Sequence, residues 1–174
     1  MTTEIAGKMG RKIEMAANVA IVIVAIVVVV VFLKSRNSGS PAQSPTISAG
    51  TELSLKNVNW QETKKHVVLA LSTSCHFCSE SGPFYQELTR SCREKGVHTI
   101  AVLPQTSKDA AAYLKGLGVS VDEIRQVPLS SIKVPSTPTL LFVDGKGIVR
   151  KVWVGKLPSE SQKEVLAQLP DSTT

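Results

Sequence analysis

Cysteine is scarce in this chain of 174 residues, which contains only Cys75, Cys78 and Cys92. Small disulfide-stapled folds use many cysteines in even numbers, so an odd count of three in a chain this long argues against such a scaffold. The first two cysteines have C-x-x-C spacing, but no second C-x-x-C follows to complete the four ligands of a structural zinc site. The spacing therefore favours redox chemistry, and we expect no metal site and no cofactor.

A dense basic block is also missing. The 20 basic and 14 acidic residues give a formal net charge of +6, and after residue 50 the positive charge is spread along the chain. Nucleic-acid-binding domains concentrate Lys and Arg on one face or in one run. We therefore expect no nucleic-acid partner. The sequence has no internal repeat either.

One long hydrophobic run is present near the N-terminus. Val19–Leu33 is uninterrupted, and the preceding Ala-Ala-Asn extends the run over residues 16–33. A helix of this length measures about 27 Å, close to the thickness of a bilayer core. We predict a transmembrane helix over residues 16–33, preceded by an N-terminal flank of residues 1–15.

Two other interpretations of the run are a cleaved signal peptide and a buried soluble helix. Lys34-Ser35-Arg36 follows directly, without the small-x-small pattern of a cleavage site, which favours an anchor that is retained. Three basic residues precede the run and two follow it, so the positive-inside rule favours a cytoplasmic N-terminus by one charge. The sequence thus predicts a single-pass membrane protein with its domain outside the cytoplasm, in a periplasm or at the cell surface.

A flexible linker is predicted next, over residues 34–50, because residues 37–50 are rich in Ser, Gly and Pro. The remaining residues, 51–174, form the predicted globular domain. Such a tether would let the domain reach partners near the membrane.

The domain combines strand and helix patterns. Apolar runs and turn residues predict strands at 51–55, His66–Ser72, Val97–Leu103, Thr139–Val143 and Ile148–Val154. Helical spacing predicts helices at Ser79–Lys95, with Gly96 at its C-terminal end, at Ser107–Leu117, and from Ser159 onward. Residues 119–134 have no clear pattern. The early strand–helix–strand unit implies a parallel pair and the last two strands a hairpin, so we expect an α/β fold with a mixed central sheet flanked by helices.

The C-x-x-C motif is Cys75-His76-Phe77-Cys78, which directly follows a predicted buried strand and begins a predicted helix. The unsatisfied N–H groups and partial positive charge at a helix N-terminus favour a thiolate and lower the pKa of a cysteine there. Cys75 is therefore the expected exposed nucleophile. Cys78, one turn later, is the expected shielded cysteine that resolves a mixed disulfide.

The two residues between the cysteines are candidates for tuning this chemistry. A protonated His76 would stabilise the Cys75 thiolate and raise the reduction potential, although a solvent-facing histidine with little effect is the alternative. Phe77 would offer an apolar lip to a partner.

The other cysteine and histidines are expected to be structural. Cys92 would lie about 21 Å from Cys78 along a continuous helix, too far for a disulfide, so we predict a buried, inert thiol. His66 and His98 are expected to be surface residues at strand ends rather than ligands.

These motifs together resemble the thioredoxin superfamily, especially its membrane-anchored TlpA-like branch, over roughly residues 51–170. Cys75 and Cys78 match the family's redox pair, and the resemblance implies that they form a disulfide. Pro83 matches the proline that kinks the active-site helix. Thr137-Pro138 matches the loop with the cis-proline, which in the family lies beside the disulfide and whose preceding backbone pairs with substrate. The resemblance implies a thioredoxin-like fold.

The sequence departs from the family pattern at several positions. Ser74 stands where Trp is common, no Pro lies between the cysteines, and Leu69-Ala70-Leu71 carries no buried acid. Glu80 lies one position from where TlpA-like proteins place an acid. Its role as proton acceptor for Cys78 is a hypothesis, with an exposed first-turn glutamate as the alternative. These departures bear on redox potential and direction.

The leading functional hypothesis is a membrane-tethered thiol–disulfide oxidoreductase that acts on extracytoplasmic protein substrates and is served by a redox partner. Its direction, reducing or oxidising, stays open. A peroxiredoxin-like peroxidase is an alternative because Ser72 lies three residues before Cys75, although the proline of such sites is missing. A copper-handling thioredoxin-like binding module using Cys75 and Cys78 is another.

Overall fold

The computed structural model describes residues 28–29, 46–61 and 63–169. The chain divides into two units, residues 1–43 and 44–174, and this boundary falls within the predicted linker. The predicted flank and nearly all of the predicted transmembrane span lie outside the described residues. Within the described ranges, no helix has the length and apolar character needed to cross a bilayer.

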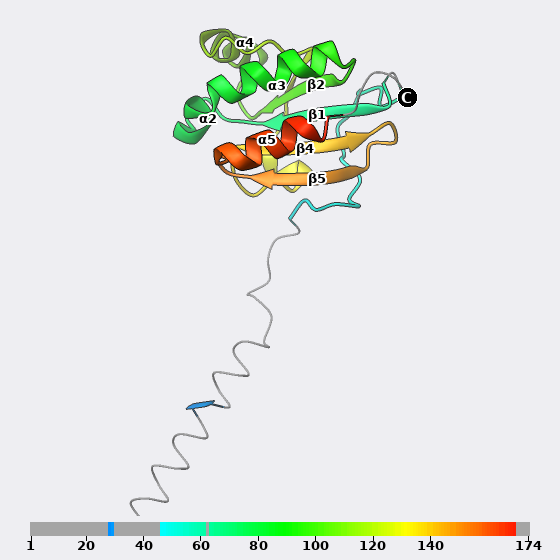
Figure 1. Cartoon of the computed structure of the whole chain (residues 1–174), viewed down its shortest axis with the longest axis vertical. Coiled ribbons are helices and arrows are strands. Elements are labelled where there is room, and N and C mark those ends of the chain that lie inside the picture. The colour runs from blue at the N-terminus through cyan, green and yellow to red at the C-terminus, as the bar shows by residue number, and fades with distance from the viewer. Residues whose placement is uncertain (1–27, 30–45, 62, 170–174) are drawn as a thin grey trace, which may run out of the picture. The chain divides into compact units, whose positions relative to one another are not determined.

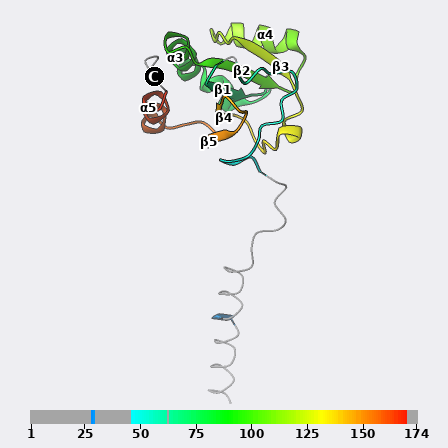
Figure 2. The same ribbon diagram turned by 90° about the vertical axis from the view of Figure 1, so that its right-hand side faces the viewer.

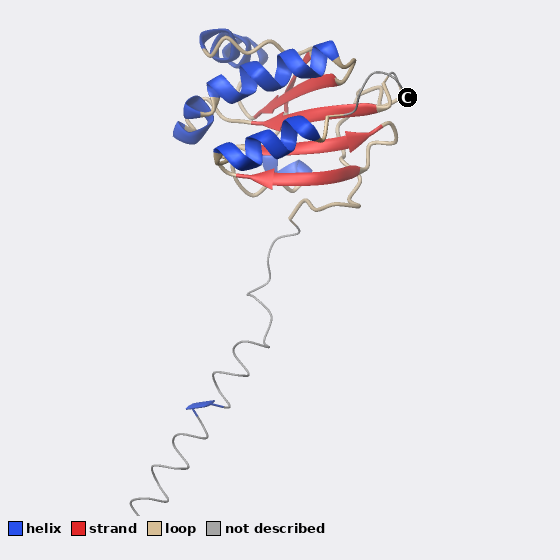
Figure 3. Cartoon of the chain, in the orientation of Figure 1, coloured by secondary structure: helices blue, strands red, loops and turns tan. Residues whose placement is uncertain are grey.

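A five-stranded sheet forms the centre of the second unit (Figures 1 and 3). Its strands are β1 (Lys65–Ala70), β2 (His98–Leu103), β3 (Glu123–Gln126), β4 (Thr139–Asp144) and β5 (Val149–Val154). They are arranged in the order β3-β2-β1-β4-β5, with β1 paired parallel to β2 and antiparallel to β4. The β2–β3 pair is parallel and the β4–β5 pair antiparallel. The predicted mixed sheet is confirmed.

Helices and loops cover the two faces of this sheet. The helices are α2 (His76–Glu80), α3 (Gly82–Glu94), α4 (Ser107–Gly116) and α5 (Ser159–Ala167), with a 3-10 turn η1 (Leu129–Ile132). In Figure 2, α3 and α5 lie on one side of the sheet, and η1 and the segment of residues 46–60 lie on the other.

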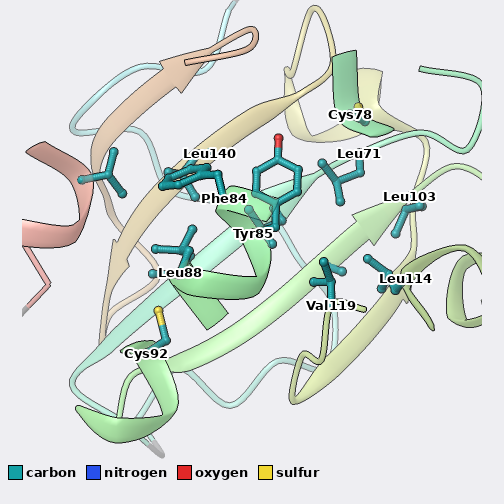
Figure 4. Packing of buried hydrophobic residues seen from close by; sticks show 14 of the residues in the cluster. Leu71, Cys78, Phe84, Tyr85, Leu88, Cys92, Leu103, Leu114, Val119 and Leu140 are labelled. Carbon is teal, nitrogen blue, oxygen red and sulfur yellow. The ribbon is translucent and has the colours of Figure 1, made fainter. Parts of the chain in front are cut away.

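Alternation along the central strand divides the interior into two clusters. Val67 and Leu69 point to the face covered by helices, where they join side chains of α3, α4 and α5 (Figure 4). Val68 and Ala70 point to the other face, where they join Leu53 and Ile132. Successive side chains of a strand point to opposite faces, so a central strand covered on both sides is apolar at every position. This explains the continuous apolar run in the sequence.

Two strand predictions were wrong or missing. Residues 51–55 form only an isolated bridge, between Glu52 and Ile148, rather than a strand. Leu53 is 2% exposed and packs into the second cluster, and its N–H donates to the Gly147 carbonyl oxygen at 2.8 Å, so burial and backbone hydrogen bonds together hold this segment. β3 arises within residues 119–134, which had no assignment. It is a short edge strand, Glu-Ile-Arg-Gln, without the apolar alternation that identifies a strand.

The predicted helix Ser79–Lys95 is two helices. Ser81 lies between them with φ −84° and ψ 0°, and its Oγ donates to the Phe77 carbonyl oxygen at 2.7 Å. Pro83 follows in the first turn of α3, where its missing N–H costs no helical hydrogen bond. The predicted C-terminal end is confirmed: Gly96 has φ +65°, and Val97 N donates to the Cys92 carbonyl at 2.8 Å.

His66 is the clearest correction on the core. The prediction of a surface histidine was wrong, since only 1% of His66 is exposed. The loop before β1 folds over it, placing Trp60 O 2.9 Å from His66 Nε2 and the Trp60 ring edge-on at 5.0 Å between centroids. The carbonyl oxygen and the hydroxyl of Thr63 also lie 3.1 and 3.3 Å from His66 Nε2. A polar ring can be buried here because it has hydrogen-bond partners.

Candidate redox site

Cys75 caps the N-terminus of α2. Its backbone is extended, with φ −87° and ψ 108°, and its sulfur accepts a hydrogen bond from Cys78 N at 3.2 Å. The two sulfurs are joined in a disulfide across a Cα–Cα distance of 5.2 Å. In the reduced protein, the same N–H and the free amides of the first turn would stabilise negative charge on Cys75 Sγ.

The two cysteines differ in accessibility. Cys78 is 0% exposed and belongs to the helix-side cluster, whereas Cys75 is half-buried at its edge. Phe77 between them is 54% exposed. An incoming sulfur can therefore reach Cys75 but not Cys78, which is the asymmetry that attack by one thiol and resolution by the other requires.

The Thr137–Pro138 loop lies directly beside Cys75. Thr137 O is 3.4 Å from Cys75 Sγ, although the residues are 62 positions apart in the chain. The loop leads into β4, which pairs with β1 from Lys65↔Asp144 to Ala70↔Thr139, and this pairing brings the two segments together. The peptide bond before Pro138 is cis. The structure thus places the predicted loop next to the predicted redox pair.

A polar network holds the loop before Cys75. Gln105 Nε2 donates to Ser72 Oγ at 3.1 Å, and Thr73 N donates to Gln105 Oε1 at 3.4 Å. Ser72 Oγ also lies 3.1 Å from Ser74 Oγ. The sequence analysis missed Gln105, which follows β2 and has no motif of its own. Ser72 is the residue on which the peroxidase alternative depends. Its hydroxyl takes part in these contacts, which hold the loop in place.

Glu80 lies at the surface, between His76 and Lys156. Its Oε1 is 3.0 Å from His76 Nε2 and its Oε2 is 2.9 Å from Lys156 Nζ. The hydrogen bond from Lys156 is the main reason that the pKa of Glu80 lies below its ordinary value. The carboxylate is thus engaged with exposed partners, while Cys78 is buried. Lys156 was not predicted, because nothing local marks a contact across 76 residues.

Cys92 is separate from the redox pair. It is the free cysteine of the described residues, is 0% exposed, and lies across the cluster from Cys78 (Figure 4). Burial raises the pKa of its thiol to about 12. The prediction of a buried thiol is confirmed. In the described parts of the chain, no group of three or more His, Cys, Asp or Glu residues is arranged to hold a metal ion.

Comparison with known proteins gives matches at the level of structure. No protein-family model matches the chain, and no curated protein matches its sequence. A Chlorobium tepidum protein described as a candidate thiol:disulfide interchange protein DsbE superposes with TM-score 0.58 and 18% identity, over 72% of this chain and 100% of that one.

Two further solved structures agree. A thiol-disulfide isomerase from Corynebacterium glutamicum has TM-score 0.52 and 17% identity, covering 74% of this chain and 97% of its own. A thiol:disulfide interchange protein from Bacteroides sp. has TM-score 0.53 and 14% identity, covering 78% and 93%. At these identities the likeness establishes the fold, which is thioredoxin-like.

Proposed function

We propose that this chain is a thiol–disulfide oxidoreductase that acts on cysteines of other proteins through Cys75 and Cys78. One observation carries the proposal: a half-buried sulfur at a helix N-terminus is joined to a fully buried one and lies 3.4 Å from the Thr137 carbonyl. The solved structures with this fold include a thiol-disulfide isomerase and a thiol:disulfide interchange protein, which supports the proposal.

The exchange proceeds in two displacements. The Cys75 thiolate attacks one sulfur of a substrate disulfide, so that a Cys75–substrate S–S bond forms as the substrate's own S–S bond breaks and the leaving thiolate takes up a proton. The Cys78 thiolate then attacks Cys75 Sγ, forming the intrachain disulfide and releasing the second substrate thiolate. Two electrons pass from the protein dithiol to the substrate. The reverse sequence oxidises a substrate dithiol, and a partner dithiol or disulfide restores the starting form.

The first test is loss of activity in a Cys75→Ser variant. Insulin reduction by dithiothreitol, followed by turbidity, should be accelerated by the unaltered protein and not by this variant. Cys92→Ser is the matched control, since it also removes one thiol but leaves the redox pair intact. Full acceleration by Cys75→Ser would refute the proposal.

The second test traps the intermediate. In a Cys78→Ser variant the resolving thiol is absent, so Cys75 should remain bound to substrate as a mixed disulfide. Non-reducing electrophoresis with a disulfide-containing protein should show a covalent adduct that dithiothreitol removes. The adduct should be missing when Cys75→Ser is added to the same variant.

We further propose that the domain is tethered to a membrane by residues 16–33, with the N-terminus in the cytoplasm and the redox domain outside it. The uninterrupted apolar run and the charges that flank it support this topology. Full-length protein should stay with the membrane fraction after alkaline extraction, and a variant lacking residues 1–43 should be released. Protease added to cells with a permeabilised outer membrane and an intact inner membrane should digest the domain. Protection of the domain from the protease in such cells would contradict the orientation.

A further inference from the structure

The ion pair between Glu80 and Lys156 joins the two sides of the candidate redox site. Glu80 is the last residue of α2, the helix that Cys75 caps, and Lys156 follows β5. Their Oε2–Nζ distance is 2.9 Å. The other carboxylate oxygen of Glu80 faces His76, at 3.0 Å, so the carboxylate bridges the residue after Cys75 and the segment after β5.

The segment that carries Lys156 also supports the Thr137–Pro138 loop. Gly155 N donates to the Pro138 carbonyl oxygen at 2.7 Å. The Thr137 carbonyl in turn lies 3.4 Å from Cys75 Sγ. The Glu80–Lys156 pair therefore closes a ring of contacts that runs from α2 through the loop and back to the sulfur.

Charge gives this ring a chemical consequence. A carboxylate near Cys75 opposes formation of the thiolate, and an ammonium or imidazolium favours it. The five-residue step from Cys75 to Glu80 corresponds to about 7.5 Å of helical rise, which is within a Debye length of about 8 Å at physiological ionic strength. Since the hydrogen bond from Lys156 lowers the pKa of Glu80, the carboxylate is ionised at neutral pH. The Tyr113 hydroxyl of α4 lies 3.1 Å from Ser79 Oγ of α2.

We propose, on the basis of the exchange reaction proposed above, that Lys156 is a positioning residue that holds and neutralises Glu80, so that the two charges together set the stability of the Cys75 thiolate. Glu80 alone would disfavour the thiolate. Paired with Lys156 it does so far less, and the reduction potential of the Cys75–Cys78 pair follows the balance between them.

The proposal predicts effects of opposite sign. Glu80→Gln leaves Lys156 and His76 without their anion, stabilises the thiolate and makes the pair more oxidising. Lys156→Gln leaves Glu80 without its cation from β5 and makes the pair more reducing. Because the groups are exposed, each change should alter the equilibrium constant with glutathione by about two- to fivefold. This corresponds to about 9–20 mV at ~30 mV per tenfold change.

The measurement is equilibration of each variant with glutathione redox buffers, with the dithiol fraction determined by alkylation and mass spectrometry. The double variant Glu80→Gln/Lys156→Gln should return close to the unaltered protein. Glu94→Gln and Lys64→Gln are the matched controls, because they remove the same charges far from the site. Glu94 is the last residue of α3 and Lys64 directly precedes β1, and each is about 20 Å of helix or strand from the end of its element that is next to the redox pair. Neither control should shift the equilibrium.

A second readout is the pH dependence of Cys75 alkylation in the reduced protein. Its midpoint should fall in Glu80→Gln and rise in Lys156→Gln, and repeating both in a His76→Gln background isolates the contribution of the pair. Shifts of the same sign in both single variants, or none beyond that of the controls, would overturn the proposal, since a merely structural bridge would be weakened alike by either substitution.

The two proposals fail separately. Potential and alkylation need no protein substrate, so opposite shifts without any insulin reduction would uphold the tuning and refute the oxidoreductase activity. Normal insulin reduction with unshifted reduction potentials would uphold the oxidoreductase activity and refute the tuning by Glu80 and Lys156.

Discussion

Selective protection of Cys92 is the prediction that most directly isolates the redox pair. Cys92 is 0% exposed, and burial raises the pKa of its thiol to about 12. The perturbation is full reduction of the protein followed by addition of iodoacetamide at pH 7.5. Because only the thiolate reacts, the rate at each cysteine follows its ionised fraction.

The magnitude follows from the two pKa values. At pH 7.5 a thiol with a pKa of about 12 is ionised in roughly one molecule in 30,000, whereas an unperturbed thiol at ~8.5 is ionised in about one in eleven. Cys92 should therefore react at least about 3,000 times more slowly than an ordinary cysteine. Its complete burial adds the requirement that the domain open first.

Mass spectrometry over time checks this. The Cys75 adduct should form quickly in the folded, reduced protein, whereas Cys78 and Cys92 are both 0% exposed, and the Cys92 adduct should form only after denaturation. In a Cys92→Ser variant the fast phase should be unchanged and the Cys92 adduct absent. Formation of all three adducts at one rate in the folded protein would refute the reasoning and would make Cys92 a candidate for redox chemistry.

Three further predictions test the packing and hydrogen bonding of the domain. Leu88→Ala should lower the free energy of unfolding by about 2–5 kcal/mol, measured by urea denaturation, because Leu88 is 0% exposed in the helix-side cluster; a loss below 1 kcal/mol would contradict this. Gln105→Ala removes two hydrogen bonds from the loop before Cys75 and should cost about 1–3 kcal/mol, with faster hydrogen exchange at Thr73 N. Asp122→Asn should reduce the stability loss on acidification: burial raises the pKa of Asp122, but hydrogen bonds from Thr99 outweigh it and bring the pKa below the ordinary 3.8. The ionised Asp122 therefore contributes to the free energy of unfolding in full above pH 3.8, and this contribution is lost as the pH falls through the lowered pKa. Equal acid sensitivity of Asp122→Asn and the unaltered protein in thermal melts would contradict this.

The best-predicted parts of the fold are those with a strong periodic pattern. Residues 67–71 are apolar at every position because β1 lies between two covered faces, and this pattern predicted its central place in the sheet. The Asp144–Gly147 turn between two apolar segments likewise predicted the β4–β5 hairpin.

Predictions failed where contacts that the hydrophobic pattern does not record decide the structure. The burial of His66 depends on Trp60 and Thr63 folding over it. β3 is held by its pairing with β2, from Ile100↔Glu123 to Leu103↔Gln126, rather than by its own polar sequence. Helical periodicity predicted one helix over residues 79–95, whereas the break at Ser81 comes just before Pro83, which has no N–H for a continuous helical ladder.

The sequence by itself determined the chemistry available here: two cysteines at C-x-x-C spacing after a buried strand, a Thr-Pro step before another strand, and a long apolar run near the N-terminus. Spacing and hydrophobic period are local properties, so a single sequence records them. Only the tertiary structure decided that Cys75 is half-buried and Cys78 enclosed, that Thr137 O lies 3.4 Å from Cys75 Sγ, and that Glu80 pairs with Lys156. Those relations arise from strand pairing and loop packing between residues more than sixty positions apart, for which no local pattern exists.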